Sequence, residues 1–418
     1  MIFLANTTLI ILTSVVIFLV VILLLVMILL YARKKLTPQG EVTLTINDDK
    51  EYTVSPGSSL LTTLSNNNIF LPSACGGQGT CGMCKIQVID GGGSILPTET
   101  GFFTRKEQKN YWRLACQVKV KEPLKLIIPK SILGIKKMEC EVVSNRNVAT
   151  FIKEFVVKLP EGEHLNFRSG GYIQIDVPKI KVDFKDIEVE EQYRDEWDKY
   201  RMWDLKMKNP EETFRAYSMA NHPAEGDIVK LNIRIATPPW DRAKGAFMNV
   251  NPGVCSSYIF SRKPGDKVMI SGPYGEFFIK ETDREMMYIG GGAGMAPLRS
   301  HIFHLFLTEH TQRKISYWYG ARSRREIFYE EEFEEIEKNN PNFSFNIALS
   351  EPKPEDNWNG YVGFIHQVLY DNYLSKHEEP EDIEYYLCGP PMMIDAVLKM
   401  LYDLGVPDEM IAFDDFGG

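Results

Sequence analysis

The sequence contains the stretch ACGGQGTCGMC at residues 74–84, which spaces three cysteines as C-x5-C-x2-C. A fourth cysteine follows in the segment RLACQ at residues 113–117. Four thiolates are what a [2Fe–2S] cluster needs, and the glycines between them let backbone amides face the sulfurs. Zinc sites usually pair two short C-x2–4-C knuckles, so a zinc site and four ordinary buried cysteines are the less favoured alternatives. We predict that the cluster ligands are Cys75, Cys81, Cys84 and Cys116.

Around these cysteines the sequence predicts a small α+β domain. Residues 41–46 alternate polar with apolar side chains, residues 52–54 resume the pattern before a Pro-Gly turn, and a short helix is expected around Leu60–Asn67. Residues 41–130 resemble a plant-type ferredoxin domain, which implies a β-grasp-like fold. That family spaces its cysteines as C-x4-C-x2-C, so the extra residue here is a departure that narrows the resemblance to a subgroup.

The N-terminal part predicts a membrane anchor. Leu9–Leu30 is a run of 22 residues without a charge, long enough at about 1.5 Å per residue to cross a hydrocarbon core of about 30 Å. A cleaved signal peptide is the alternative, but no Lys or Arg precedes the run and no small-x-small site follows it. Because Arg33, Lys34 and Lys35 follow at once, the positive-inside rule places the N-terminus outside and the body in the cytoplasm.

The composition limits the classes of partner. The chain has 418 residues, of which 44% are hydrophobic and 25% charged, as in globular proteins of several domains. Its net charge is −9 and it has no block of basic residues, so we expect no nucleic-acid partner. Seven cysteines, four of them in one pattern, favour metal binding in a reducing compartment over a disulfide framework.

From Met138 onward, short strands separated by turn residues predict an antiparallel barrel. The expected strands are Glu139–Ser144, Phe151–Leu159, Tyr172–Val177, Phe214–Met219, Lys230–Ala236 and Lys267–Ser271. Between them, residues 182–212 form an insertion with 11 Asp+Glu against 6 Lys+Arg. Its apolar residues recur at helical spacing and are expected to pack on their own domain, with a docking surface for a partner subunit as the alternative. These residues are Tyr193, Trp197, Tyr200, Trp203 and Met207.

Two motifs in this barrel point to a flavin. The segment RAYS (residues 215–218) ends one strand, and PGVCSSY (residues 252–258) opens a helix. A glycine-led helix start offers amides to a pyrophosphate, an arginine can neutralise it, and a tyrosine can lie against an aromatic ring system. If the motifs were chance matches, Arg215 would form a surface salt bridge and Tyr217 would be a core residue.

Together with GPYG (residues 272–275), these motifs resemble the ferredoxin–NADP⁺ reductase superfamily. The resemblance implies FAD, with Tyr217 against the isoalloxazine and Ser218 near its reactive nitrogen. It implies that the pyrophosphate is held by Arg215, Gly253, Val254, Cys255, Ser256 and Ser257.

The C-terminal part predicts a parallel α/β domain that binds a nucleotide. Met286–Ile289 runs into the segment GGGAGMAP (residues 290–297), and an apolar helix follows at Leu298–Leu307. A strand, a glycine-rich turn and a helix form a phosphate-binding geometry, but the glycines do not fit G-x-G-x-x-G, so an ordinary Rossmann dehydrogenase is disfavoured. Further strands are expected at Ile315–Tyr319, Phe343–Leu349 and Tyr385–Leu387, and helices at Glu326–Lys338, Val362–Tyr370 and Met392–Leu404.

The segment CGPPM (residues 388–392) places a second turn between a strand and a helix. With the glycines it resembles the nucleotide half of the same superfamily, which implies a nicotinamide near Cys388 and, near the C-terminus, an aromatic residue that covers the flavin, here Phe416. A frayed tail is the alternative for Phe416. The resemblance implies catalytic roles for Ser218, Cys388 and Phe416. It assigns to NADH the residues Gly291, Gly292, Ala293, Gly294, Met295, Ser350, Glu351, Cys388, Gly389 and Pro390.

The donor is predicted to be NADH because of Ser350 and Glu351. NADPH-using members of the superfamily typically carry Ser followed by Arg at this strand end, and the guanidinium pairs with the 2′-phosphate. Glu351 stands in place of that Arg and would repel a phosphate while accepting hydrogen bonds from a ribose. Three arginines after the preceding strand are the counter-argument, since they could reach a phosphate: Arg322, Arg324 and Arg325.

The sequence therefore predicts a multidomain α+β and α/β chain in four parts. These are an anchor (1–36), a [2Fe–2S] ferredoxin domain (37–132), an FAD-binding barrel (133–281) and an NADH-binding domain (282–418). The whole chain resembles the F-subunit family of the bacterial Na⁺-translocating NADH:quinone oxidoreductases. The resemblance implies electron input from NADH in the inner membrane, with other membrane subunits as partners that reduce quinone and translocate Na⁺. A membrane-tethered NADH reductase of an oxygenase and a redox sensor without turnover are the alternatives.

Overall fold

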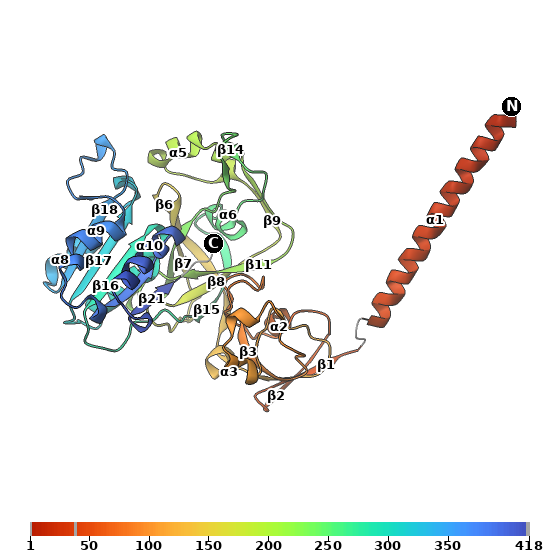
Figure 1. Ribbon diagram of the computed structural model, residues 1–418, viewed down its shortest axis with the longest axis horizontal. Coiled ribbons are helices and arrows are strands. Elements are labelled where there is room, and N and C mark those ends of the chain that lie inside the picture. The colour runs from red at the N-terminus through yellow and green to blue at the C-terminus, as the bar shows by residue number, and fades with distance from the viewer. Residues whose placement is uncertain (1, 37–39, 415–418) are drawn as a thin grey trace. The chain divides into compact units, whose positions relative to one another are not determined.

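The computed structural model describes residues 2–36 and 40–414, so Phe416 lies outside the described residues. The described chain divides into two compact units (Figure 1). One comprises residues up to 71 together with 77–134, and the other comprises 72–76 together with 135 onward. The predicted barrel and the predicted α/β domain thus belong to one unit.

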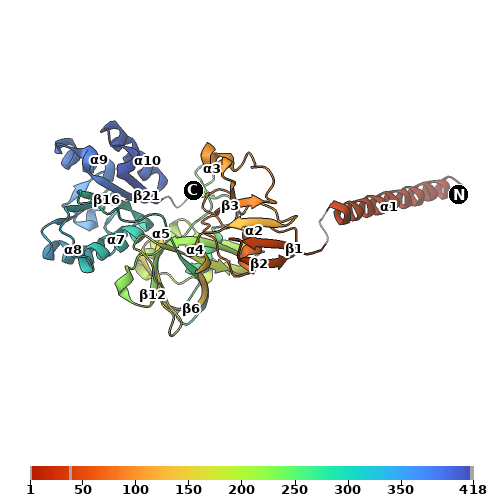
Figure 2. The same ribbon diagram turned by 90° about the horizontal axis from the view of Figure 1, so that it is seen from below.

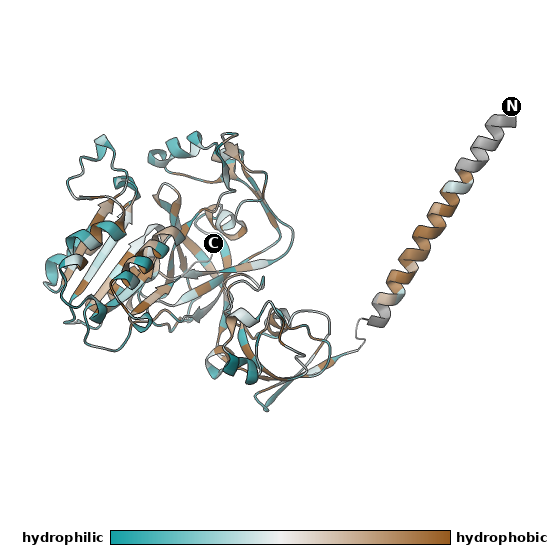
Figure 3. Ribbon diagram, viewed as in Figure 1, coloured by the Kyte–Doolittle hydropathy of each residue, from teal (hydrophilic) through white to brown (hydrophobic). Residues whose placement is uncertain are grey.

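The helix α1 runs from Ile2 to Leu36, and Figure 3 shows its middle as a continuous apolar stretch. Its segment Leu12–Ala32 is long and apolar enough to cross a membrane, and none of that segment is buried against protein. Among the described residues it is the one helix with this property.

The ferredoxin part folds as a five-stranded sheet with short helices. Its sheet order is β2-β1-β5-β3-β4, in which β1 and β5 are parallel and the other pairs antiparallel. The predicted hairpin and helix are confirmed as β1, β2 and α2, and Ser59 caps α2 by accepting from the amide of Thr62. The elements are β1 (Val42–Ile46), β2 (Lys50–Val54), α2 (Leu60–Asn66), β3 (Lys85–Asp90), α3 (Arg105–Lys109), β4 (Trp112–Leu114), β5 (Leu124–Ile127) and α4 (Lys130–Leu133).

The second unit begins with a six-stranded antiparallel sheet of order β11-β8-β15-β6-β7-β12. A bridge between Met219 and Leu231 joins the two edge strands, so the sheet curls into the predicted barrel. Its interior holds Phe155, Ile173 and Ile270, all with no exposed surface. The elements are β6 (Lys136–Ala149), β7 (Ile152–Lys158), β8 (Tyr172–Val177), β11 (Thr213–Ser218), β12 (Ile228–Arg234), α6 (Val254–Phe260) and β15 (Lys267–Tyr274).

The insertion packs on the barrel, as its apolar spacing predicted. Tyr193, Trp197 and Met207 are buried in the barrel core, and Tyr200 and Trp203 pack partly buried against it. The stripe is not one helix, however, because the backbone turns sharply at Arg201, whose φ of 53° is left-handed. Short elements carry it instead: β9 (Ile180–Asp183), α5 (Arg194–Lys199) and β10 (Lys206–Asn209), with β9 and β10 antiparallel.

The C-terminal sheet has the order β19-β18-β17-β16-β20-β21, and all its pairs are parallel. Figure 2 shows α7 and α8 on one face and α9 and α10 on the other. The strands are β16 (Met286–Gly291), β17 (Ile315–Ala321), β18 (Phe343–Leu349), β19 (Tyr361–Val362), β20 (Glu384–Cys388) and β21 (Ile411–Asp414). The helices are α7 (Met295–Leu307), α8 (Glu330–Asn339), α9 (Ile365–Asn372) and α10 (Pro391–Asp403).

Three predicted helix starts in this domain are wrong, and the first is that of α7, which begins at Met295 and not at Leu298. The helix expected from Glu326 begins at Glu330, because Tyr329 has a left-handed φ of 60° that ends the preceding turn. The helix expected from Val362 begins at Ile365, because Val362 pairs with Leu349 as part of β19 and Gly363 then turns with a φ of 132°. The last of these differences arises from strand pairing with β18, which the local pattern does not contain.

Candidate functional site

The cysteine loop depends on glycines at two tight approaches. Gly79 and Gly82 have left-handed φ values of 81° and 68°. A Cβ on Gly79 would lie 2.3 Å from the Gln117 amide nitrogen, and one on Gly82 would lie 2.5 Å from the Phe102 ring. The left-handed φ favours glycine at both positions, and at Gly82 the Phe102 ring also leaves no room for a Cβ, whereas the flexible Gln117 side chain could move away from Gly79.

Two cysteines of this loop, Cys81 and Cys84, interact electrostatically with each other, and Cys84 also interacts with Cys116 from outside the loop. A side-chain hydrogen bond with Cys116 and burial raise the pKa of the Cys84 thiol, and the charge of Cys81 acts in the same direction. The Gln117 side-chain amide donates to the Cys116 sulfur at 3.8 Å, and the Ser73 hydroxyl lies 4.0 Å from the Cys75 sulfur. Polar donors at sulfur are the surroundings that tune an iron–sulfur cluster.

No three His, Cys, Asp or Glu side chains among the described residues are grouped around a single metal-ion position. A two-iron cluster does not need that arrangement, because it divides its four cysteines between two irons. The all-thiol donor set and the glycine loop fit such a cluster, with Cys75, Cys81, Cys84 and Cys116 as the residues that would hold it.

At the barrel, the predicted flavin residues come together. Burial raises the pKa of the Tyr217 phenol, and it raises the pKa of the Cys255 thiol to about 12. Arg215 lies close enough to both groups that its positive charge opposes these shifts. Arg215 has no carboxylate within ion-pair distance in the described chain and donates to the Phe214 carbonyl at 2.7 Å. The surface salt bridge weighed as an alternative for Arg215 is thus not present among these residues.

The two serines at the start of α6 are occupied locally. Ser257 donates its hydroxyl to the Gly253 carbonyl at 2.6 Å, and the Ser256 hydroxyl accepts from the Ala236 amide at 3.1 Å. Gly253 approaches so closely that a Cβ would lie 2.5 Å from the Ala236 Cβ. The backbone amides of this turn, rather than the serine hydroxyls, are what the site offers to an anion.

A contact that the sequence did not predict joins the barrel to the C-terminal strand. The Ser218 hydroxyl donates to the Asp414 carboxylate at 2.6 Å. Asp414 in turn pairs in the sheet with Cys388, which has no exposed surface. Asp414 therefore stands between the two described residues predicted to be catalytic. Its only signal in the sequence was its place in the tail DDFGG.

The turns after β16 and β20 meet at the point where the strand order reverses. A Cβ on Gly294 would lie 2.1 Å from the Cys388 carbonyl oxygen, and one on Gly389 would lie 3.1 Å from the Gly291 amide. The crevice at such a reversal is where open α/β sheets bind ligands. The glycine-rich motif after β16 and the CGPPM motif after β20 thus lie at the same crevice.

A cavity of about 560 Å³ opens at this crevice. Of the residues predicted to bind NADH, four line it: Gly291, Gly292, Ser350 and Pro390. Met295 is instead buried against Tyr317, whose hydroxyl donates to its sulfur at 3.3 Å. The other predicted residues do not line this cavity: Ala293, Gly294, Glu351, Cys388 and Gly389.

Arg234 is a residue of this cavity that the sequence reasoning missed. It ends β12, burial lowers its pKa, and the nearby Glu326 opposes that shift. No carboxylate lies within ion-pair distance of Arg234 in the part of the chain that the structure describes. An arginine without such a partner beside a glycine turn suits a pyrophosphate. Its position at a strand end in the other domain gave no motif to recognise.

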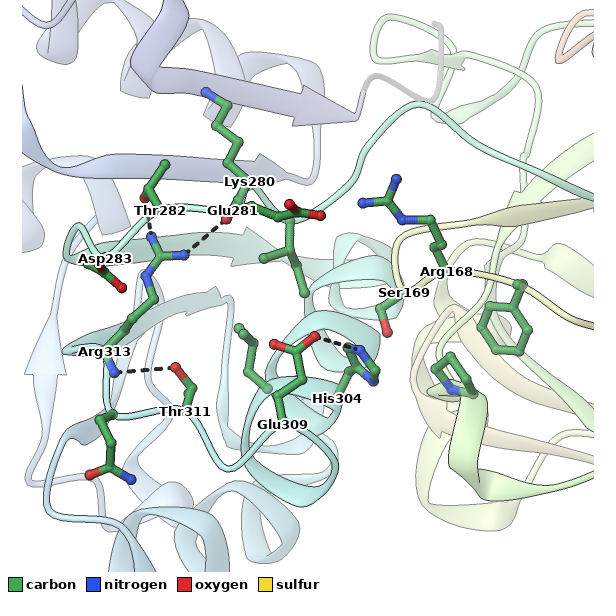
Figure 4. A pocket seen from close by; sticks show the side chains of 15 residues that line it. Arg168, Ser169, Lys280, Glu281, Thr282, Asp283, His304, Glu309, Thr311 and Arg313 are labelled. Atoms are coloured by element: carbon green, nitrogen blue, oxygen red, sulfur yellow. Dashed lines mark hydrogen bonds and ion pairs between the residues drawn. The ribbon is translucent and has the colours of Figure 1, made fainter.

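A second cavity, of about 700 Å³, lies near the start of β16, and none of the predicted site residues lines it. In Figure 4, Arg313 bonds to Thr282 and to the carbonyl of Lys280, and His304 pairs with Glu309. Arg313 also forms a 2.7 Å ion pair with the buried Glu384. The sequence motifs contribute no residue to this larger cavity, whereas they contribute several to the smaller one, so the smaller cavity is the candidate nucleotide site.

The chain is similar to known protein families and to named proteins. Three family models match the chain: a 2Fe-2S iron-sulfur cluster binding domain over residues 44–121, an Oxidoreductase FAD-binding domain over 198–279 and an Oxidoreductase NAD-binding domain over 288–399. The F-subunit of the Na(+)-translocating NADH-quinone reductase of Klebsiella pneumoniae is 57% identical over 93% of this chain and 94% of that protein. The protein of the same name in Methylococcus capsulatus is 55% identical over 93% and 94%.

A solved structure gives the same picture of the fold. The ferredoxin reductase in carbazole 1,9a-dioxygenase is 26% identical, with a TM-score of 0.58 over 90% of this chain and 99% of that chain. The order of the three matched domains in this chain is cluster, flavin and nicotinamide.

Proposed function

The chain belongs to the F-subunit family of the Na(+)-translocating NADH-quinone reductases, and from this premise we propose which residues perform its chemistry. It is the electron-input subunit, an NADH:quinone reductase component that oxidises NADH and passes the electrons by way of FAD to a [2Fe–2S] cluster. FAD, when bound, accepts electrons in pairs from a nicotinamide and releases them singly. The relatives are each one subunit of a complex, so the chain works with other subunits.

We propose that Arg215 and the backbone of residues 253–257 hold the FAD pyrophosphate. Arg215 has no carboxylate partner among the described residues. The Gly253 and Ser257 amides already donate to the Ala236 and Gly253 carbonyls, so the amides of Val254, Cys255 and Ser256 at the start of α6 are the ones offered to an anion. Tyr217 would lie against the isoalloxazine, with Phe416 as its cover. The support is that Arg215 lies close enough to Tyr217 and Cys255 for its charge to act on the pKa of both.

The NADH phosphates would be bound by the Gly291–Gly294 turn and by Arg234, and the nicotinamide would lie at the Ser218–Asp414–Cys388 contact. The carboxylate of Asp414 fixes the direction of the Ser218 hydroxyl, and the buried Cys388 would form one wall of the site. Such a site contributes by orienting the nicotinamide and excluding water. The division of the chain at residues 36/37, 132/133 and 281/282 is part of the same proposal.

We propose a single crossing of the bacterial inner membrane by α1, with the N-terminus outside and the body in the cytoplasm. Arg33, Lys34 and Lys35 support this orientation. The span Leu9–Leu30 has no ionisable residue, so the Na⁺ path would lie in partner subunits, which would also reduce the quinone.

The observation that carries this function is the presence of cluster, flavin and nicotinamide domains together with an apolar helix on one chain. Purification of the tagged chain from native membranes in mild detergent tests its partners. We expect membrane subunits with NADH:quinone reductase activity to copurify. An oxygenase in their place would contradict the proposal and favour the oxygenase reductase that the sequence left open.

A prediction on coenzyme choice arises at Ser350 and Glu351. We expect kcat/KM for NADH to exceed that for NADPH by at least about 10-fold, or about 1.4 kcal/mol, because Glu351 repels a 2′-phosphate. Glu351→Arg should shift the preference toward NADPH, since a guanidinium there can pair with the phosphate. Steady-state kinetics with both donors measures the ratio.

Glu355→Arg is the matched control, because Glu355 is as exposed as Glu351 but lies in the turn Pro354–Asp356. Glu351 instead follows the cavity residue Ser350 directly, and its amide donates to the carbonyl of the cavity residue Arg322. Its ratio should stay at the value of the unaltered chain. Equal efficiency with both donors before any substitution would show that Glu351 does not select between them.

A further inference from the structure

The three arginines after β17 pair with carboxylates, so they are not free to bind a 2′-phosphate as their position in the sequence suggests. Arg324 pairs with Glu330 at 3.6 Å, and its amide donates to Asp356. Arg322 and Arg325 instead turn toward the insertion of the barrel, where α5 presents two adjacent carboxylates.

The pairing with the insertion is specific. Arg325 donates to Asp195 at 2.9 Å and lies 3.6 Å from one oxygen of Glu196. Arg322 lies 3.6 Å from the other oxygen of Glu196 and 3.4 Å from Glu326. Glu196 is only 7% exposed, and that second oxygen, Oε2, has no hydrogen-bond partner within the described residues. The buried carboxylate is balanced by the two guanidinium charges and by Lys199 at 3.3 Å.

The helix that carries Glu196 is held rigidly. The next residue, Trp197, has no exposed surface and donates its indole N–H to the Thr150 carbonyl at 2.9 Å. The Thr150 amide donates to Glu326 at 3.1 Å, and its hydroxyl also bonds to Glu326. The insertion, the turn between β6 and β7 and the arginine loop thus share one network that holds Glu196 in place.

This network borders the nucleotide cavity on the side of β17 and β18. Arg322, Glu326 and Ser350 all line the cavity, and the Glu351 amide donates to the Arg322 carbonyl at 2.8 Å. In parallel sheets of this kind the adenosine ribose lies beyond these strand ends, where an arginine accommodates the 2′-phosphate of NADP. Arg322 lies where it could bind a 2′-phosphate, but the negative charges of Glu196 and Glu326 beside it would repel that phosphate.

On the basis of the NADH site in the proposed function, we propose that the insertion is a coenzyme-selectivity element, in which Glu196 keeps Arg322 and Arg325 paired and so excludes nucleotides that carry a 2′-phosphate. Glu196 is a specificity-determining residue that does not line the cavity itself and acts through Arg322. The acidic insertion and Glu351 then disfavour NADPH from two different segments.

Glu196→Gln tests this inference, since it keeps the shape of the side chain and removes its charge. The NADPH/NADH ratio of kcat/KM should rise about fivefold, or about 1 kcal/mol, the size expected for one ion pair. Calorimetry should show tighter binding of adenosine 2′,5′-bisphosphate relative to 5′-AMP by a similar factor. Glu196→Asp, which keeps the charge, should leave both ratios near those of the unaltered chain.

A second substitution tests whether the change in coenzyme preference depends on Arg322 or only on altered packing around residue 196. Adding Arg322→Gln to Glu196→Gln should abolish the gain for 2′-phosphate ligands, because the freed guanidinium is then missing. Glu332→Gln is the matched control, since it removes a 2.6 Å carboxylate–arginine pair with Arg299 that does not line the cavity. An unchanged ratio in Glu196→Gln, or a gain that survives loss of Arg322, would overturn the proposal.

If Glu196→Gln does not fold with FAD, Asp195→Asn serves in its place. The Asp195 side chain is 59% exposed and pairs with Arg325 alone among the arginines. Without Asp195, Arg325 keeps Glu196 as its carboxylate partner on α5 and competes with Arg322 for it. The same ratio should therefore rise by a smaller factor, and a ratio that stays constant would count against the proposal equally.

Discussion

Replacement of Cys116 by alanine should abolish the EPR signal of the reduced [2Fe–2S] cluster while the absorbance of the flavin remains. A [2Fe–2S] cluster needs four protein ligands, and Cys116 is the one that comes from outside the glycine loop, directly after β4. Quinone reduction by the assembled complex should fall at least about 100-fold, or about 2.7 kcal/mol on the barrier. EPR of the reduced protein and quinone assays on membranes measure the two effects.

Cys140→Ala is the control for this experiment. Cys140 is also fully buried, but it lies in β6 of the barrel, outside the cysteine pattern. Its replacement should leave the cluster signal in place. An intact signal in Cys116→Ala would refute the ligand assignment.

Deletion of residues 1–35 should separate membrane attachment from NADH oxidation. No motif residue lies in this segment, so the shortened chain should stay in the soluble fraction, keep FAD and reduce artificial acceptors within about twofold of the full chain. NADH-dependent quinone reduction in membranes should fall at least about 100-fold, because the cluster is no longer held beside its partners. Fractionation and the two activity assays measure these effects.

A chain in which another single apolar span replaces α1 is the control. It should return to the membrane fraction, and its recovery of quinone reduction measures how far α1 serves as an anchor alone. Loss of FAD from the shortened chain would mean that the span supports folding of the body, contrary to the proposed division.

Local patterns predicted most of the architecture because the signals were local. The alternation at residues 41–46 and 52–54 gave the hairpin of β1 and β2, and the strand expected at Tyr172–Val177 is β8. The glycine-rich turn after β16 was readable because close backbone approach, here of Gly294 to the Cys388 carbonyl, demands glycine.

What the sequence could not predict depends on contacts between distant segments. The bond between Ser218 and Asp414 joins residues 196 positions apart. Asp195 and Glu196 belong to the acidic insertion, and nothing in the sequence paired them with Arg322 and Arg325, which only the fold brings beside them. Arg234 ends an ordinary strand, and only the arrangement of the two domains places it at the nucleotide cavity. The role of Phe416 stays a prediction.

The most direct test of electron input is an anaerobic titration of the purified full-length chain with NADH, followed by optical and EPR spectroscopy. We expect excess NADH to bleach the flavin absorbance and then to produce the EPR signal of a reduced [2Fe–2S] cluster in the same molecules. A flavin that NADH reduces while the cluster stays oxidised would contradict the transfer from FAD to the cluster. A flavin that NADH does not reduce would contradict electron input from NADH altogether.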